Sequence, residues 1–238
     1  MSWIDQIFRY CERGADPSFW AEPLNAVSNG AFIIAALAAG IAYARQPRPE
    51  ASPAVPALIG LVLVIGAGSF LFHTFATRWS AQADVIPIGL FMLAYMGFAL
   101  RVYLKLGWLW TAVGLALFIG ALQIAGDVQC RPGLISVSAA ARGPCLNGTA
   151  GYAPAFLAML GIGAVLAAKR HPAARYLLLA SAVFLASMLF RTVDLELCAM
   201  TRVAGTTIGT HFLWHILNAT TLYLLLMAAV RHGFRSRL

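Results

Sequence analysis

Five polar residues lie in apolar stretches of this chain, where a membrane segment would normally exclude them. Ser69 and His73 share the sequence GSFLFH, Asp84 follows near the start of the next apolar run, and His211 and His215 belong to HFLWH. An ionisable residue inside a membrane segment is energetically expensive, so it usually faces the protein interior and has a function. Three imidazoles with a carboxylate and a hydroxyl are the components of a catalytic zinc site that keeps one position open for water. The pattern predicts hydrolytic metal chemistry inside a membrane.

The spacing of these residues predicts that they meet. Ser69 and His73 are four residues apart, so they share one face of a helix. His211 and His215 have the same spacing, and two ring nitrogens one helical turn apart can bind one metal ion. His73 ends one predicted span, whereas Asp84 and His211 lie near the start of two others. All of these positions should therefore lie at the same depth, near one membrane surface.

Each group has a predicted role in this chemistry. Three neutral imidazoles, from His73, His211 and His215, would hold zinc and leave it a bound water with a pKa of about 7. Asp84 would hold or deprotonate that water and then pass the proton to a leaving group. Ser69 would donate a hydrogen bond to the developing oxyanion. A Ser–His–Asp triad is one alternative, and histidines that only form interhelical hydrogen bonds are another.

The composition indicates that most of the chain lies in lipid. Of its 238 residues 61% are hydrophobic and 11% are charged, whereas about a quarter are charged in a soluble domain. The mean hydropathy is +0.77. Apolar stretches of roughly 17–25 residues, long enough to span a bilayer, occur about seven times. We expect a single all-α domain over 1–238, a seven-transmembrane helix bundle with an extramembrane N-terminal segment at 1–23 and an outer loop at 127–150. The predicted spans are 24–44, 55–76, 82–104, 108–126, 151–168, 174–196 and 205–230.

The charges predict an orientation for this multi-pass membrane protein. The net charge of +8 comes from basic residues in short loops, where membrane topology explains them. A basic patch with interleaved aromatic residues, which nucleic-acid binding would need, is not apparent in the sequence, so we predict no nucleic-acid partner. More Lys and Arg residues fall on the side of the C-terminus than on the side of the N-terminus. We therefore expect the N-terminus outside, the C-terminus in the cytoplasm, and the site near the outer (periplasmic or lumenal) face.

The four cysteines all fall on the predicted outer side. They are Cys11, Cys130, Cys145 and Cys198. Disulfides persist in oxidising compartments, and four cysteines allow three connectivities. In one of these, Cys130–Cys145 closes the outer loop and Cys11–Cys198 ties the N-terminal segment to the end of the sixth span. Four free thiols are the alternative.

Three polar residues near the predicted site have less specific interpretations. Arg191 and Asp194 are three residues apart, so we expect them to form an ion pair on one helix face. Asn218 lies on the same helix face as His211. It could hold a metal ligand in place or join two helices by a hydrogen bond.

The site residues resemble a known pattern. The CREST group of membrane hydrolases has Ser-x3-His late in the second span, Asp early in the third and His-x3-His in the last. This chain matches that pattern at Ser69, His73, Asp84, His211 and His215. Within the group, AEPLNAVSN (21–29) and VDLELC (193–198) resemble the alkaline ceramidase family. The resemblance covers nearly the whole chain.

The resemblance implies a seven-helix bundle with zinc on His73, His211 and His215. It also implies hydrolysis of a ceramide-like lipid from the bilayer to a fatty acid and a long-chain base. The same motif would serve an enzyme that cleaves another lipid amide or ester, such as an N-acyl amino-acid lipid. A seven-helix receptor or transporter with structural zinc is a third hypothesis, in which Asp84 would complete a closed four-ligand site. The sequence makes no prediction of the oligomeric state.

Eukaryotic members of this family also carry an acidic N-terminal segment that binds calcium. Here the segment reads Arg9-Tyr10-Cys11-Glu12, with an arginine where the family tends to have an acid. A calcium ion takes six to eight oxygen ligands. The alternative is that Glu12 and Asp16 are solvated and that Glu22 caps a helix or forms a pair near its start. The predicted calcium ligands are Glu12, Asp16, Glu22 and Asn25.

Overall fold

Seven helices of the structure are long and apolar enough to cross a membrane. The computed structural model describes residues 2–47, 52–129, 145–203 and 205–233. The first span consists of α1 (Pro23–Ser28) and α2 (Gly30–Ala44), the second of α3 (Ala54–Phe75), and the third of α4 (Arg78–Phe98) with a π-helical end, η2 (Ala99–Tyr103). The remaining spans are α5 (Trp108–Gly126), the 3-10 helix η3 (Cys145–Tyr152) with α6 (Ala153–Ala168), α7 (Ala174–Thr192) and α8 (His211–His232). The predicted all-α seven-span architecture is confirmed.

Four predicted helix ends are wrong. The fifth span begins at Cys145 rather than at 151, because the 3-10 helix η3 precedes α6. The third span begins at Arg78 rather than at 82, because Thr77 and Ser80 form a capping box that starts the helix in a polar stretch. The sixth span ends at Thr192 instead of continuing to 196. The seventh begins at His211 rather than at 205, since a short hairpin of β1 (Arg202–Val203) and β2 (Thr206–Thr207) precedes it.

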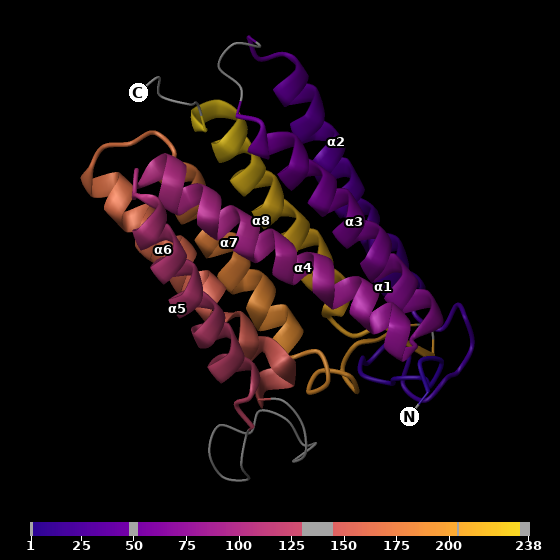
Figure 1. Cartoon of the computed structure of the whole chain (residues 1–238). Helices are drawn as coiled ribbons and strands as arrows, with labels where there is room; N and C mark the ends of the chain where they lie inside the picture. Colours follow the sequence, from indigo (N-terminus) through magenta and orange to yellow (C-terminus); the bar gives the residue numbers. More distant parts are fainter. Residues whose placement is uncertain (1, 48–51, 130–144, 204, 234–238) are drawn as a thin grey trace.

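Helix α8 lies in the middle of the bundle, in contact with α2, α3 and α7 (Figure 1). In the apolar membrane-spanning stretch of α8, 67% of the residues are buried inside the protein, compared with 11% in that of α5. His211, His215, Asn218 and Thr221 of α8 are buried and therefore face other helices. Because α3 ends and α8 begins at the same end of the bundle, the last turn of one lies near the first turn of the other.

Helices α3 and α4 approach each other most closely at Gly68. A Cβ atom at this position would overlap the carbonyl oxygen of Ala83, on the facing turn of α4. Only a glycine fits here, and this contact brings the next residue of α3, Ser69, close to the first turns of α4.

The N-terminal segment covers the end of the bundle at which α3 ends and α8 begins. The amide of Ile7 donates to the carbonyl of Ala76 at 2.6 Å, just beyond the end of α3. A disulfide joins Cys11 to Cys198, as one of the predicted connectivities requires. The other predicted bridge, Cys130–Cys145, involves Cys130, which lies outside the described residues, so this pairing stays a prediction. The orientation of the termini also stays a prediction.

Candidate metal centre

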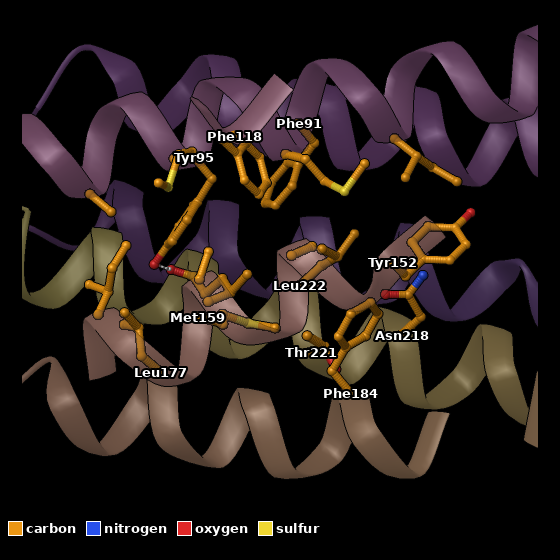
Figure 2. A pocket seen from close by; sticks show the side chains of 18 of the residues that line it. Phe91, Tyr95, Phe118, Tyr152, Met159, Leu177, Phe184, Asn218, Thr221 and Leu222 are labelled. Atoms are coloured by element: carbon orange, nitrogen blue, oxygen red, sulfur yellow. Dashed lines mark hydrogen bonds between the residues drawn. The ribbon is translucent and has the colours of Figure 1, made fainter. Parts of the chain in front are cut away.

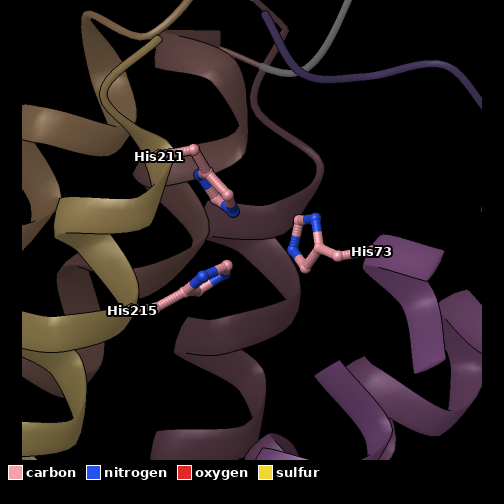
Figure 3. A group of neighbouring side chains, drawn as sticks. All are labelled: His73, His211 and His215. Atoms are coloured by element: carbon pink, nitrogen blue, oxygen red, sulfur yellow. The ribbon is translucent and has the colours of Figure 1, made fainter. Parts of the chain in front are cut away.

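Three histidine side chains converge between α3 and α8 (Figure 3). His73 lies in the last turn of α3, and His211 and His215 lie in the first turns of α8. Each offers a ring nitrogen within 4.8 Å of the other two, and each side chain is at most 2% exposed. In the described part of the chain, this is the one group of three or more His, Cys, Asp or Glu residues with such spacing.

Hydrogen bonds orient two of these rings. His73 Nδ1 lies 2.5 Å from Glu22 Oε2, and His215 Nδ1 lies 2.8 Å from Ser28 Oγ. Nε2 of each ring is then left for a metal ion, and His73 Nε2 is buried without a hydrogen-bond partner among the described residues. A metal-bound histidine usually forms such a hydrogen bond through its other nitrogen. The three residues therefore fit a divalent metal that imidazoles bind well, zinc included.

The carboxylate that holds His73 is itself held by a buried arginine. Arg13 Nε donates to Glu22 Oε1 at 2.5 Å, and the Arg13 side chain is fully buried. Its two terminal nitrogens donate to four backbone carbonyls, those of Asp16, Ser18, His73 and Thr74. Burial raises the pKa of Glu22, but the bonds and charge of His73, with the bonds from Arg13 and Asn25, outweigh burial and leave that pKa below its ordinary value. Arg13 and Ser28 were not predicted as site residues.

The residues predicted to bind calcium make other contacts. Both carboxylate oxygens of Glu12 accept backbone N–H groups, those of Leu24 and Asn25, at 2.8 Å. Burial raises the pKa of Glu12, and these two bonds oppose that rise. Asp16 is exposed and accepts the amide of Ser18. The alternative of a solvated residue therefore fits Asp16 and not Glu12, which is 8% exposed.

The Arg13 guanidinium already lies beside one of the carboxylates that were predicted to bind calcium. Both oxygens of Glu22 already bond to Arg13 and His73, and Asn25 Nδ2 donates to the same carboxylate at 3.0 Å. In this arrangement the segment does not offer the six to eight oxygens that calcium takes. We therefore do not expect calcium to bind to this arrangement, and the effect of calcium on thermal stability tests this.

Ser69 and Asp84 line the same cavity as His211 and His215. Both are buried, at 3% and 8% exposure, on helices that meet at Gly68. The empty volume of this cavity is about 490 Å³. The structure thus brings together the predicted metal ligands, carboxylate and hydroxyl, although they come from three helices.

The predicted ion pair between Arg191 and Asp194 is wrong for the described part of the chain. Asp194 instead accepts the backbone N–H groups of Cys11, Thr210 and His211, at 3.0, 2.7 and 2.9 Å. Burial raises the pKa of Asp194, and these three bonds oppose that rise. The carboxylate therefore caps the start of α8 and ties the N-terminal segment to the turn that carries His211.

Arg191 instead faces aromatic rings beside the metal centre. Its Nη1 donates to the hydroxyl of Tyr10 at 3.3 Å, and its guanidinium carbon lies 5.1–5.8 Å from the ring centroids of Tyr10, Tyr152 and Trp214. The Tyr10 ring in turn stacks on His211, with the centroids 3.8 Å apart. Tyr10 was not predicted as a site residue, because nothing in its local sequence links it to Arg191, which lies 181 positions away.

A second, apolar cavity adjoins the metal centre (Figure 2). Its empty volume is about 720 Å³, and residues of α4, α5, α6, α7 and α8 line it. Ile65, Ile88, Tyr152 and Asn218 line both cavities. Tyr152 and Asn218 lie at one end and Tyr95 toward the other, where its hydroxyl donates to the carbonyl of Leu225 at 3.1 Å. The space is suited to a hydrocarbon chain.

Comparisons with known proteins agree with this architecture. A search of curated proteins finds no match. A family model described as Ceramidase matches residues 9–234. The matched range contains all three histidines, Ser69 and Asp84, and it extends over all seven spans. The chain therefore belongs to the ceramidase family.

Proposed function

We propose that this protein is a zinc-dependent membrane amidase that hydrolyses a ceramide-like lipid to a fatty acid and a long-chain base. The observation that carries the proposal is the convergence of His73, His211 and His215 beside an apolar cavity within the bundle. Membership of the ceramidase family supports amide hydrolysis.

His73, His211 and His215 would hold the metal. When bound at three neutral imidazoles, zinc would act as a Lewis acid and lower the pKa of its bound water to about 7. Glu22 keeps the proton of His73 on Nδ1, because a carboxylate can only accept, and so leaves Nε2 free for the metal. The Ser28 hydroxyl donates to the carbonyl of Asn25, so its oxygen can accept a hydrogen bond from His215 Nδ1 and leave Nε2 of that ring for the metal.

Asp84 would transfer the proton, and Ser69 would stabilise the negative charge that develops on the carbonyl oxygen. Asp84 accepts a proton from the attacking water and delivers it to the amide nitrogen as the C–N bond breaks. Its burial beside the histidines supports this role. The Ser69 hydroxyl, one helical turn before His73, donates to the carbonyl oxygen as negative charge develops there.

The apolar cavity would receive one hydrocarbon chain of the lipid. Asn218 and Tyr152, which line both cavities, would then lie near the amide bond. The seven spans support entry of the substrate from the bilayer. We also propose that the site faces the outer side, since the Cys11–Cys198 disulfide lies at the same end of the bundle and disulfides persist in oxidising compartments.

Two alternative functions make different predictions. A hydrolase that cleaves another lipid amide or ester would use the same residues. A receptor or transporter with structural zinc would need a fourth protein ligand. Among the described residues, Asp84 does not join the group of three histidines whose ligand atoms lie within 4.8 Å of one another, which favours an open site and hence an enzyme.

Mass spectrometry of lipids tests the proposal. Purified protein is incubated with ceramides, N-acyl amino-acid lipids and glycerophospholipids, and zinc is quantified in the same samples. Wild type should release a fatty acid with its matching amine, whereas His215→Ala should lose both zinc and product. His232→Ala, at the far end of α8, should behave as wild type. Failure of zinc-loaded wild type to cleave any lipid would refute the proposal.

A further inference from the structure

Arg191 has no acidic partner in the part of the chain that the structure describes. Its only hydrogen bond there is the one to the Tyr10 hydroxyl, and its Nε is buried without a partner. The nearest acid in sequence, Asp194, uses its oxygens for three backbone amides. The guanidinium therefore lies among aromatic rings, and no carboxylate of the described residues forms a hydrogen bond or ion pair with it.

A guanidinium in such surroundings is energetically unfavourable unless a ligand binds to it. A guanidinium inside a membrane protein normally pairs with an acid or lines a functional cavity, and a buried donor without a partner destabilises the folded protein. Arg191 lines the cavity that contains the metal ligands His211 and His215. Its free donors are therefore available to whatever occupies this cavity.

The charges around the cavity favour an anionic occupant. Arg9 and Arg191 both line it, and Asp84 is the one carboxylate among its described lining residues. Two further acids near the site have other partners: Glu22 is paired with Arg13, and Asp194 accepts three backbone amides. A divalent metal on the histidines would add two further positive charges, which leaves the cavity positively charged.

The position of Arg191 indicates where the anionic group would lie. Its guanidinium donates to the hydroxyl of Tyr10, and the ring of Tyr10 stacks directly on the proposed metal ligand His211. One aromatic ring thus separates the guanidinium from the metal centre. A group held by Arg191 would lie close to the scissile amide, whereas the hydrocarbon chain would extend into the apolar cavity on the side of Asn218.

We propose that Arg191 binds a carboxylate carried on the amine side of the lipid amide, so that the preferred substrate is an acidic lipid of the N-acyl amino-acid class. This inference rests on the amide hydrolysis of the proposed function and replaces its ceramide-like substrate by an acidic lipid amide. The planar fork of a guanidinium matches a carboxylate with two parallel hydrogen bonds. Ceramide lacks that group, so its headgroup would leave the guanidinium without an ionic partner.

A pair of substrates with one acyl chain tests the proposal. N-palmitoylglycine carries a carboxylate beside the amide, and N-palmitoylethanolamine carries a neutral hydroxyl in the same region. Wild type should prefer the acid in kcat/KM by about ten- to a hundredfold, the range expected for a hydrogen bond to a charged group. Arg191→Gln should lose this preference, mainly through KM, and Arg191→Lys should keep part of it because the charge remains.

Three measurements separate the possible outcomes. Zinc content and thermal stability of Arg191→Gln should equal those of wild type, and Arg231→Gln, at the other end of the bundle where Arg231 bonds to Tyr176, should keep the preference. Binding of both lipids to the metal-free protein gives a readout that needs no activity, and wild type should bind the acid more tightly. Equal loss of both substrates in Arg191→Gln, or equal binding of both lipids by wild type, would overturn the proposal.

The carboxylate of the fatty acid product is a second source of the same chemistry. If Arg191→Gln relieves inhibition by palmitate but leaves the substrate preference unchanged, Arg191 binds the product and the proposal is wrong. If zinc-loaded wild type cleaves ceramide and both test lipids without preference, the inference about Arg191 fails while the amidase function stands. If it cleaves none of them, the amidase function fails, and lipid binding alone then decides the inference.

Discussion

Replacing Glu22 by glutamine should weaken metal binding at a site that Glu22 does not itself occupy. Glu22 Oε2 lies 2.5 Å from His73 Nδ1, and both side chains are almost fully buried. A carboxylate only accepts, so it keeps the imidazole proton on Nδ1. Because Arg13 Nε donates to the other oxygen of Glu22, a glutamine would keep its amide oxygen toward Arg13. Its amide nitrogen would then donate to Nδ1 of His73 and drive the proton to Nε2. Metal binding would then have to displace that proton.

The magnitude follows from the hydrogen bond that is lost. A hydrogen bond to a charged group contributes about 1.5–3 kcal/mol, and every 1.4 kcal/mol is about tenfold in affinity. Solvent screens this bond little, because Glu22 is only 3% exposed. We expect Glu22→Gln to bind zinc about ten- to a hundredfold more weakly, a range typical of changes to the partners of metal-bound histidines.

Competition with a zinc chelator of known affinity measures this effect. Glu12→Gln is the matched control, because Glu12 is a buried carboxylate of the same segment that bonds to the backbone amides of Leu24 and Asn25 and not to a histidine. Its zinc affinity should equal that of wild type, although its thermal stability should fall. Wild-type affinity in Glu22→Gln, or an equal loss in both variants, would refute the reasoning.

Three further predictions concern the frame around the site. Gly68→Ala should destabilise the protein by about 1–3 kcal/mol, because the new methyl group overlaps the backbone of α4; thermal unfolding measures this, and Gly60→Ala, a position on the same helix with open space around it, should have little effect. Calcium should leave the Tm of wild type unchanged, because the Arg13 guanidinium lies among the oxygens of the N-terminal segment, whereas a Tm that rises with calcium concentration would establish a calcium site there. Reduction of Cys11–Cys198 should lower the free energy of unfolding by about 2–5 kcal/mol, and unfolding with and without a reductant, beside a Cys11→Ser variant that no longer responds to it, would test this.

Local sequence determined the spans and much of the site. The number of membrane helices follows from the length of the apolar runs, because each must satisfy its backbone hydrogen bonds within the lipid. The four-residue spacing of His211 and His215 was enough to place them on one helix face, and the helix positions of His73 and Asp84 put them at a matching depth. Helix ends in polar stretches were predicted less well, since the capping box at Thr77 starts α4 where hydropathy alone gives no signal.

The tertiary structure alone decided which distant polar groups meet. Glu22 holds His73 across 51 residues, and Tyr10 meets Arg191 across 181. The spacing of Arg191 and Asp194 predicted an ion pair, but the backbone amides at the start of α8 donate to that carboxylate instead. Helical periodicity reports only neighbours within a few turns. The choice among competing partners depends on where the chain folds back on itself. For that reason the orientation of the proposed metal ligands, and the lack of a carboxylate bonded to Arg191 among the described residues, became visible only in three dimensions.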